Sequence, residues 1–89
     1  MEKLDIAYNV VNEFIDVGLI YGEPDFFFEA LCFAILAVCD KDEMIALPES
    51  AKEDLNRLGV AYQEKSENVY IRAWDCANNI ESLYEYIYI

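Results

Sequence analysis

Length, composition and charge set the first limits on this protein. The chain has 89 residues, of which 56% are hydrophobic, and its 18 acids against 6 bases give a formal net charge of −12 at pH 7. This length predicts one globular domain over residues 1–89, and the hydrophobic content argues against disorder. The charge exceeds the magnitude of roughly 2 to 8 that suits a small domain. It is therefore either a solubility or salt adaptation or the function itself.

The first predicted element is an amphipathic helix over residues 2–17. Its polar side chains fall in one stripe about 100° wide, which consists of Glu2, Asp5, Asn9, Asn12, Glu13 and Asp16. The opposite face is apolar and wide, and it consists of Leu4, Ile6, Ala7, Tyr8, Val10, Val11, Phe14, Ile15 and Val17. We expect Gly18 or Gly22 to end this helix.

The second predicted element is a core helix. Residues 26–38 are apolar except for Glu29, and a membrane-spanning helix needs about 20 such residues, so we expect no membrane partner. Pro24 suits the first helical turn, where Glu23 and Asp25 are placed favourably for the helix dipole. A short helix that is apolar nearly all round is usually enclosed by its own domain, so the buried residues are predicted to be Phe28, Leu31, Ile35 and Val38.

A third helix is predicted over residues 48–59, after a segment (44–47) that forms either a short strand or a connector. Pro48 starts the helix and Gly59 ends it, and Ser50 and Glu53 have the spacing of a capping box. Its buried stripe is expected to consist of Ala51, Leu55 and Leu58.

A β-hairpin and a last helix complete the chain. Residues 60–63 and 69–74 are β-branched and aromatic runs that flank a polar turn. In the second run, Val69, Ile71 and Ala73 share one face, while the other face carries Tyr70, Arg72 and Trp74. Asp75 is placed to cap a helix whose apolar stripe is Ile80, Leu83, Tyr84 and Ile87. The predicted fold is α+β and mostly helical: three helices, a β-hairpin and a C-terminal helix, in the order α-α-α-β-β-α.

The cysteines predict a reducing compartment. Cys32 and Cys39 are separated by about 10 Å along one helix, which is too far for a disulfide. These two residues and Cys76 have apolar neighbours, as buried reduced thiols usually do. The chain opens with alternating charges and not with a signal-peptide pattern. The sequence therefore predicts a cytoplasmic protein.

The residue types exclude several kinds of chemistry. The chain has no histidine and no threonine, and its serines are Ser50, Ser66 and Ser82, so a nucleophile paired with histidine is impossible. Closely spaced Cys and His pairs for zinc are missing, and residues 40–51 lack the glycine and glutamate of a calcium loop. No glycine-rich phosphate loop is present. We predict no enzymatic activity, no catalytic or metal-binding residues and no cofactor.

Direct nucleic-acid binding is also excluded by charge. Three helices followed by a hairpin is the order of a winged helix, in which the third helix would read the nucleic acid. That helix carries three acids against Lys52 and Arg57. Binding a polyanion requires clustered Lys and Arg, so this helix would repel it.

The acids themselves form three organised groups: a stripe along the first helix, a group at the start of the core helix that includes Glu29, and a group just past its end. Rigid helices hold carboxylates at fixed spacings, as a nucleic-acid backbone holds phosphates. We therefore predict a basic partner, namely a nucleic-acid-binding protein or nuclease complex. Aromatic side chains would anchor it, although packing at the edge of the core is the alternative for them. The predicted partner-binding residues are Glu2, Asp5, Glu13, Asp16, Glu23, Asp25, Asp40, Asp42, Glu43, Tyr86 and Tyr88.

In size, charge and cysteine usage the chain resembles two groups of proteins. These are the small acidic immunity proteins that neutralise bacterial nuclease toxins, and phage-encoded inhibitors of host defence, which include anti-CRISPR proteins and DNA mimics. The resemblance implies an inhibitor that occludes a nucleic-acid-binding site, in the host cytoplasm if a phage encodes it. The alternative is a structural or interaction module, such as a homodimer that buries surplus apolar surface.

Overall fold

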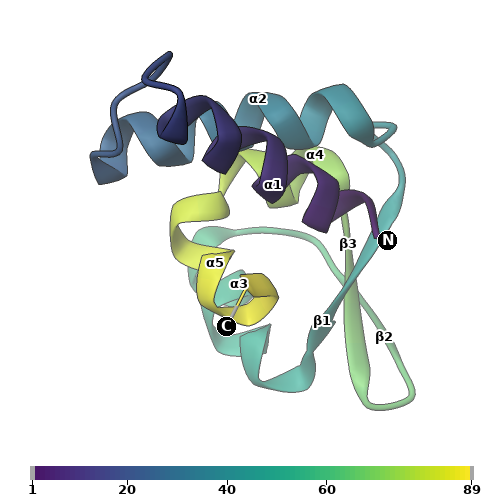
Figure 1. Ribbon diagram of the computed structural model, residues 1–89. Coiled ribbons are helices and arrows are strands. Elements are labelled where there is room, and N and C mark those ends of the chain that lie inside the picture. The colour runs from purple at the N-terminus through teal and green to yellow at the C-terminus, as the bar shows by residue number, and fades with distance from the viewer. Residues whose placement is uncertain (1, 89) are drawn as a thin grey trace.

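The computed structural model describes residues 2–88 as a group of helices with a small antiparallel sheet at one side (Figure 1). In chain order the elements are α1 (Lys3–Asp16), α2 (Pro24–Val38), β1 (Met44–Pro48), the 3-10 turn η1 (Glu49–Ala51), α3 (Lys52–Leu58), β2 (Gln63–Lys65), β3 (Asn68–Arg72), α4 (Ala73–Asn78) and α5 (Ile80–Tyr88). The predicted α+β, mostly helical class is confirmed. The sheet has three strands where a two-stranded hairpin was predicted, because residues 44–47 belong to β1.

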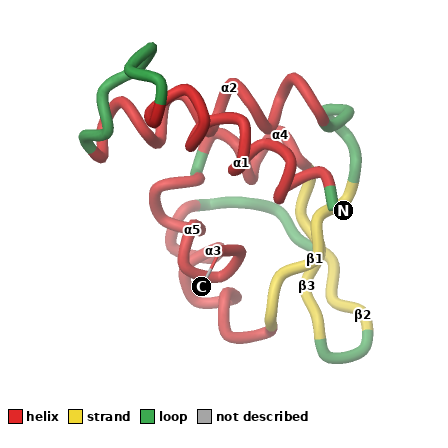
Figure 2. The backbone as a smooth tube through the Cα atoms, in the orientation of Figure 1, coloured by secondary structure: helices red, strands yellow, loops and turns green. Residues whose placement is uncertain are grey.

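The sheet has the strand order β1-β3-β2, with both pairs antiparallel. Ile45 pairs with Ile71 and Leu47 pairs with Val69, and all four side chains are buried. The alternate residues of β1 and β3 face away from the core, as the period of two in a strand requires. One face of the sheet thus joins the core, while Figure 2 shows the β2–β3 turn at the outer end of the sheet.

Helices α1 and α2 form an antiparallel hairpin that lies across the rest of the molecule. α2 packs against α1 on one side and against α4 and α5 on the other, and α4 contacts β1 and β3. The turn between α1 and α2 lies at the end of the molecule opposite the sheet (Figures 1 and 2). No helix within residues 2–88 has the length and apolar character needed to cross a membrane.

The core is apolar throughout and draws on most elements. Its largest fully buried side chains are Val11, Leu31, Ile35, Leu47, Leu55, Val69, Ile71, Cys76 and Leu83. Burial of Leu31 and Ile35 was predicted and is confirmed, whereas Phe28 and Val38 are only partly buried against the core. In the same way, Ala51 and Leu55 of the third helix, and Ile80 and Leu83 of the last one, are buried, while Leu58, Tyr84 and Ile87 lie at the edge of the core.

The prediction that Trp74 continues a strand was wrong. β3 ends at Arg72, and α4 begins at Ala73. The backbone N–H of Ala73 donates to the carbonyl oxygen of Glu43 at 2.8 Å, and that of Trp74 donates to the carbonyl oxygen of Lys41 at 3.0 Å. These two carbonyl groups satisfy N–H groups at the start of α4 that have no partner within the helix, so the chain turns into a helix there.

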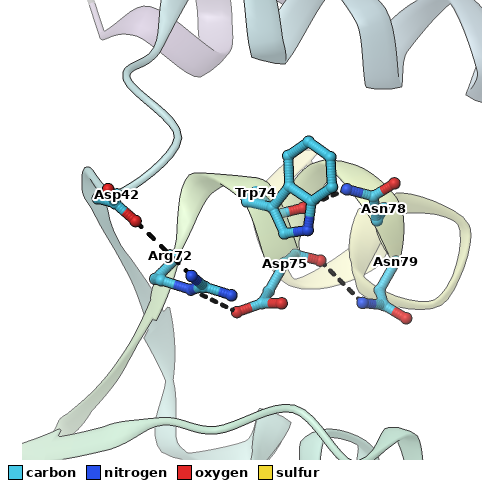
Figure 3. A network of polar contacts seen from close by, with 6 residues as sticks. All are labelled: Asp42, Arg72, Trp74, Asp75, Asn78 and Asn79. Carbon is cyan, nitrogen blue, oxygen red and sulfur yellow. Dashed lines mark hydrogen bonds and ion pairs between the residues drawn. The ribbon is translucent and has the colours of Figure 1, made fainter.

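Asp75 was predicted to cap the last helix, and this was also wrong. The residue before α4 is Arg72, and Asp75 lies in the first turn of α4. Its carboxylate accepts a hydrogen bond from Arg72 Nε at 3.1 Å, and Figure 3 shows the two side chains facing each other. The predicted single helix is two helices, α4 and α5, which meet at Asn79.

The predicted capping box at residues 50–53 does not form either. Pro48 is the last residue of β1, and Ser50 lies within η1. The residue that precedes α3 is Ala51, and no side chain makes a capping hydrogen bond there. The predicted end of this helix is confirmed, since Gly59 follows α3 with a φ of 72°, a conformation in which glycine is favoured.

Candidate functional site

The basic residues are distributed very unevenly over the fold. Residues 4–40 contain no lysine and no arginine, and they form nearly all of the α1–α2 hairpin. Five of the six basic residues lie between Lys41 and Arg72, in the sheet, in α3 and in their connections. The hairpin of residues 4–40 carries seven acids, which are Asp5, Glu13, Asp16, Glu23, Asp25, Glu29 and Asp40.

The ion pairs follow the same division. Outside the hairpin, Lys52 pairs with Glu49 at 3.9 Å and also with Glu64. Arg57 pairs with Asp54 at 2.6 Å. None of the seven hairpin acids takes part in an ion pair with any residue from 2 to 88, and all seven are exposed. Negative charge is therefore partly neutralised on the sheet side and unopposed on the hairpin.

Basic side chains lie near the end of the hairpin that is closest to the sheet. Lys3 Nζ lies 2.7 Å from Glu43 Oε1, and this hydrogen bond lowers the pKa of Glu43. Arg72 lies between Asp75, whose Oδ2 is 3.1 Å from Nε, and Asp42, whose Oδ1 is 3.6 Å from Nη1 (Figure 3). These two carboxylates raise the pKa of Arg72, and Asp75 has the larger effect. In the predicted third group of acids, Asp42 and Glu43 are thus ion-paired, whereas Asp40 has no ion pair within residues 2–88.

The opposite end of the hairpin gathers acids without any base. Because α1 and α2 are antiparallel, the last turn of α1 lies beside the first turns of α2 (Figure 1). This brings together two groups that the sequence separates. We call them the acidic rim, which consists of Glu13, Asp16, Glu23, Asp25 and Glu29. All five are exposed.

The same end of the hairpin carries a group of exposed apolar side chains. We call it the apolar tip, which consists of Phe14, Val17, Leu19, Tyr21, Phe26 and Phe33. Two open hollows meet at Leu19. One, of about 420 Å³, lies between the turn and α2 and is lined by Leu19, Tyr21, Phe26, Phe33 and Glu29, among others. The other, of about 480 Å³, is lined by Phe14, Val17, Leu19, Glu13 and Asp16.

The local sequence explains the shape of the turn. Gly18 has a φ of 79°, and its N–H donates to Ile15 O at 3.0 Å, while the N–H of Leu19 donates to Phe14 O at 2.8 Å. These two bonds form a Schellman motif, in which the residue after the glycine is placed near the residue five positions before it. Leu19 and Phe14 accordingly line the same hollow.

The start of α2 fixes the other side of the turn. Pro24 occupies the first helical position, and Glu23 precedes the helix with an extended backbone, as the sequence predicted. The fixed φ of proline suits this position. The ring of Tyr21 packs on that of Phe26, with centroids 5.4 Å apart.

The predicted partner-binding residues fall into three places. Glu13, Asp16, Glu23 and Asp25 belong to the acidic rim, at the end of the hairpin that carries the turn (Figure 1). The acids at the sheet end of the hairpin lie apart from them, and they are Glu2, Asp5, Asp40, Asp42 and Glu43. Both tyrosines lie on α5 and are partly buried, with hydroxyl groups already engaged: Tyr86 bonds to Asp54 Oδ2, and Tyr88 bonds to Leu4 O at 2.7 Å.

Sequence reasoning missed the apolar tip because it expected residues 26–38 to form an enclosed core helix and gave Leu19 and Tyr21 no role. α2 is not enclosed on all sides, since Phe33 is 65% exposed while Leu31 and Ile35 are fully buried. Two signals in the sequence point to the tip. The apolar residues between Gly18 and Gly22 lie in a turn, and no basic residue occurs between positions 4 and 40.

Thiol and metal chemistry receive no support from the geometry. Cys39 and Cys76 are buried, and burial raises the pKa of Cys76 to about 12, which suppresses its nucleophilic thiolate form. Within residues 2–88, no three Cys, Asp or Glu side chains are grouped so that they could hold a metal ion. No protein-family model, curated protein or solved structure matches this chain.

Proposed function

We propose that this protein is a non-catalytic inhibitor that covers a basic, nucleic-acid-binding site on a partner protein with its acidic hairpin. One observation carries the proposal, namely that residues 4–40 present seven acids and no base. A surface of one sign speeds association with a surface of the opposite sign and repels partners of like charge. The proposed partner is a nuclease or another nucleic-acid-binding complex, as for an immunity protein or a phage-encoded DNA mimic.

The rigidity of the hairpin supports this proposal. The five rim carboxylates lie on or directly beside α1 and α2, whose junction is fixed by the backbone bonds of Gly18 and Leu19. A partner that binds phosphates at fixed spacings would meet carboxylates carried by backbone positions that are also fixed in spacing. The helices of the hairpin are already formed before binding, so little conformational entropy of their backbone is lost when the partner binds, and this favours affinity.

The test compares two double variants of equal charge. Glu13→Lys with Asp16→Lys changes the acidic rim. Glu53→Lys with Glu67→Lys changes two exposed acids on α3 and on the β2–β3 turn that form no ion pair within residues 2–88. Each double variant changes the formal charge from −12 to −8, since each substitution adds two positive units. The partner is captured at low salt from lysates of candidate host bacteria, and the association rate of each variant with it is then measured.

We expect the rim variant to associate much more slowly than the wild type and the control variant to stay close to it. Binding should weaken as salt rises, because salt screens exposed charges, and DNA or RNA should compete for the same site. Equal losses for the two variants, or an affinity independent of salt, would contradict the proposal.

A homodimeric interaction module is the second candidate, and the exposed apolar tip is the observation that favours it. A symmetric dimer buries the same patch of both subunits. Light scattering distinguishes the two candidates, because the dimer would have twice the monomer mass of 10.3 kDa.

A further inference from the structure

The most exposed large apolar side chains within residues 2–88 all belong to the apolar tip. Val17, Leu19, Tyr21 and Phe33 are 68%, 70%, 72% and 65% exposed, and no other large apolar side chain from residue 2 to 88 exceeds 46%. Single exposed apolar residues are normal on a protein surface. A group of them around two adjoining hollows, rimmed by polar residues, is typical of an interaction site.

The tip is held in this exposed arrangement by the backbone. The bond from Leu19 N–H to Phe14 O fixes the backbone of the turn at Leu19, and it places this residue beside Phe14 in the same hollow. On α2, Phe26, Ala30 and Phe33 follow one another at helical spacing along the hollow that they line, and the buried face of the helix is occupied by Leu31 and Ile35. The surface is therefore formed before any partner arrives.

Charge decides which kind of partner fits this surface. In a symmetric pairing of two copies, each acidic rim would face another rim, and like charges brought together oppose association. An anionic membrane surface would be repelled for the same reason. A protein segment whose apolar side chains are flanked by Lys and Arg satisfies both parts of the surface at once.

We propose that the apolar tip anchors the inhibitory interface by receiving a basic amphipathic segment of the partner. Its apolar side chains enter the two hollows that meet at Leu19, and its Lys and Arg side chains meet the acidic rim. This inference rests on the proposed function, and it adds a component of binding that salt does not screen.

The experiment uses two synthetic peptides of identical leucine and lysine composition. In the first, the sequence places all leucines on one face of a helix; in the second, the leucines are scattered. Their affinities are measured for the wild-type protein, for the tip variant Leu19→Ser with Phe33→Ser, and for Met44→Ser. Met44 is an apolar residue of β1 that is 42% exposed, so it is the matched control. Denaturant unfolding verifies that all variants stay folded.

We expect the wild type to bind the amphipathic peptide about tenfold more tightly than the scattered one, because burial of one large apolar side chain has about that effect on affinity. The tip variant should lose this preference and Met44→Ser should keep it. At high salt, only the amphipathic peptide should retain binding to the wild type.

Equal affinities of the two peptides for the wild type would overturn the inference, as would an equal loss in the tip variant and in Met44→Ser. A dimer in light scattering that the tip variant abolishes would show that the occupant is a second copy. Binding to uncharged lipid vesicles that the tip variant abolishes would show that it is a membrane. The rim variant tests the proposed function separately: if Glu13→Lys with Asp16→Lys binds both peptides as the wild type does, electrostatic recognition fails whatever the tip does.

Discussion

The hydroxyl group of Tyr88 donates a hydrogen bond of 2.7 Å to the backbone carbonyl oxygen of Leu4. This bond joins the last turn of α5 to the first turn of α1, across 84 positions of the sequence. The ring of Tyr88 also stacks on that of Tyr8, with centroids 4.8 Å apart and an angle of 23° between the planes. The last helix thereby holds the sheet end of the hairpin in place.

Replacing Tyr88 with Phe should lower the free energy of unfolding by about 1 kcal/mol, which is the usual net value of one such hydrogen bond. The ring stack should survive, because phenylalanine keeps the ring. Tyr21→Phe is the control, since the hydroxyl of the exposed Tyr21 makes no hydrogen bond within residues 2–88. Urea unfolding of both variants provides the measurement. If Tyr88→Phe and Tyr21→Phe lose the same stability, the hydrogen bond to Leu4 O does not stabilise the contact between α1 and α5.

The two faces of α2 should respond differently to truncation. Leu31→Ala or Ile35→Ala should cost about 2 to 5 kcal/mol, because both side chains are fully buried and the substitution leaves a cavity. Phe33→Ala, on the exposed face of the same helix, should cost much less although it removes more atoms. Denaturant titrations give the three values. A large loss for Phe33→Ala would mean that the face carrying the apolar tip is packed and not open.

The helices of the hairpin could be predicted because their ends depend on neighbouring residues. Gly18 adopts a positive φ just after α1, and Pro24 fixes the first turn of α2, and both signals are visible in the sequence. The exposed positions of the acidic stripe followed from helical periodicity in the same way. The buried face of α2 was predicted correctly at Leu31 and Ile35. The exposure of the opposite face around Phe33 was not predicted, because its residues are mostly apolar too and only packing on α1, α4 and α5 decides which face is covered.

The start of α4 could not be predicted for a related reason. Residues 69–74 alternate as a strand should, and the pattern gives no reason to stop at Arg72. The helix begins there because Lys41 and Glu43, about 30 positions earlier, offer their carbonyl groups to the N–H groups of Ala73 and Trp74. These contacts between distant segments exist only once β1 has paired with β3.

Stability should fall in alkaline solution. Burial raises the pKa of Cys76 from 9.0 to about 12, so the folded protein binds this proton more tightly than the unfolded chain does. The contribution is fully present below about pH 9, and it is lost as the pH rises towards about 12. Urea unfolding at about pH 8 and about pH 10.5 should therefore give a lower free energy of unfolding at the higher pH. Cys76→Ala should show a shallower fall, and an identical fall in that variant would contradict the assignment.

The three cysteines should react with thiol reagents in a definite order. Cys32 is partly exposed, whereas Cys39 and Cys76 are buried, and only an accessible thiolate reacts. Mass spectrometry of the native protein after timed labelling should show Cys32 modified first, Cys39 later and Cys76 only when the protein opens. In concentrated urea the three rates should converge. Labelling of Cys76 as fast as Cys32 under native conditions would show that the interface between α2 and α4 opens readily.

The absence of basic residues between positions 4 and 40 also determines which methods can observe this surface. Trypsin cleaves after Lys and Arg, so it releases residues 4–41 as one peptide that contains the whole tip and rim. Cross-linkers that couple lysine amines find Lys3 and Lys41 at the sheet end of the hairpin and none near Leu19. A cross-linking map of a complex made with such reagents would therefore place every contact on the sheet side of the molecule. Reagents that couple carboxylates would report on the tip.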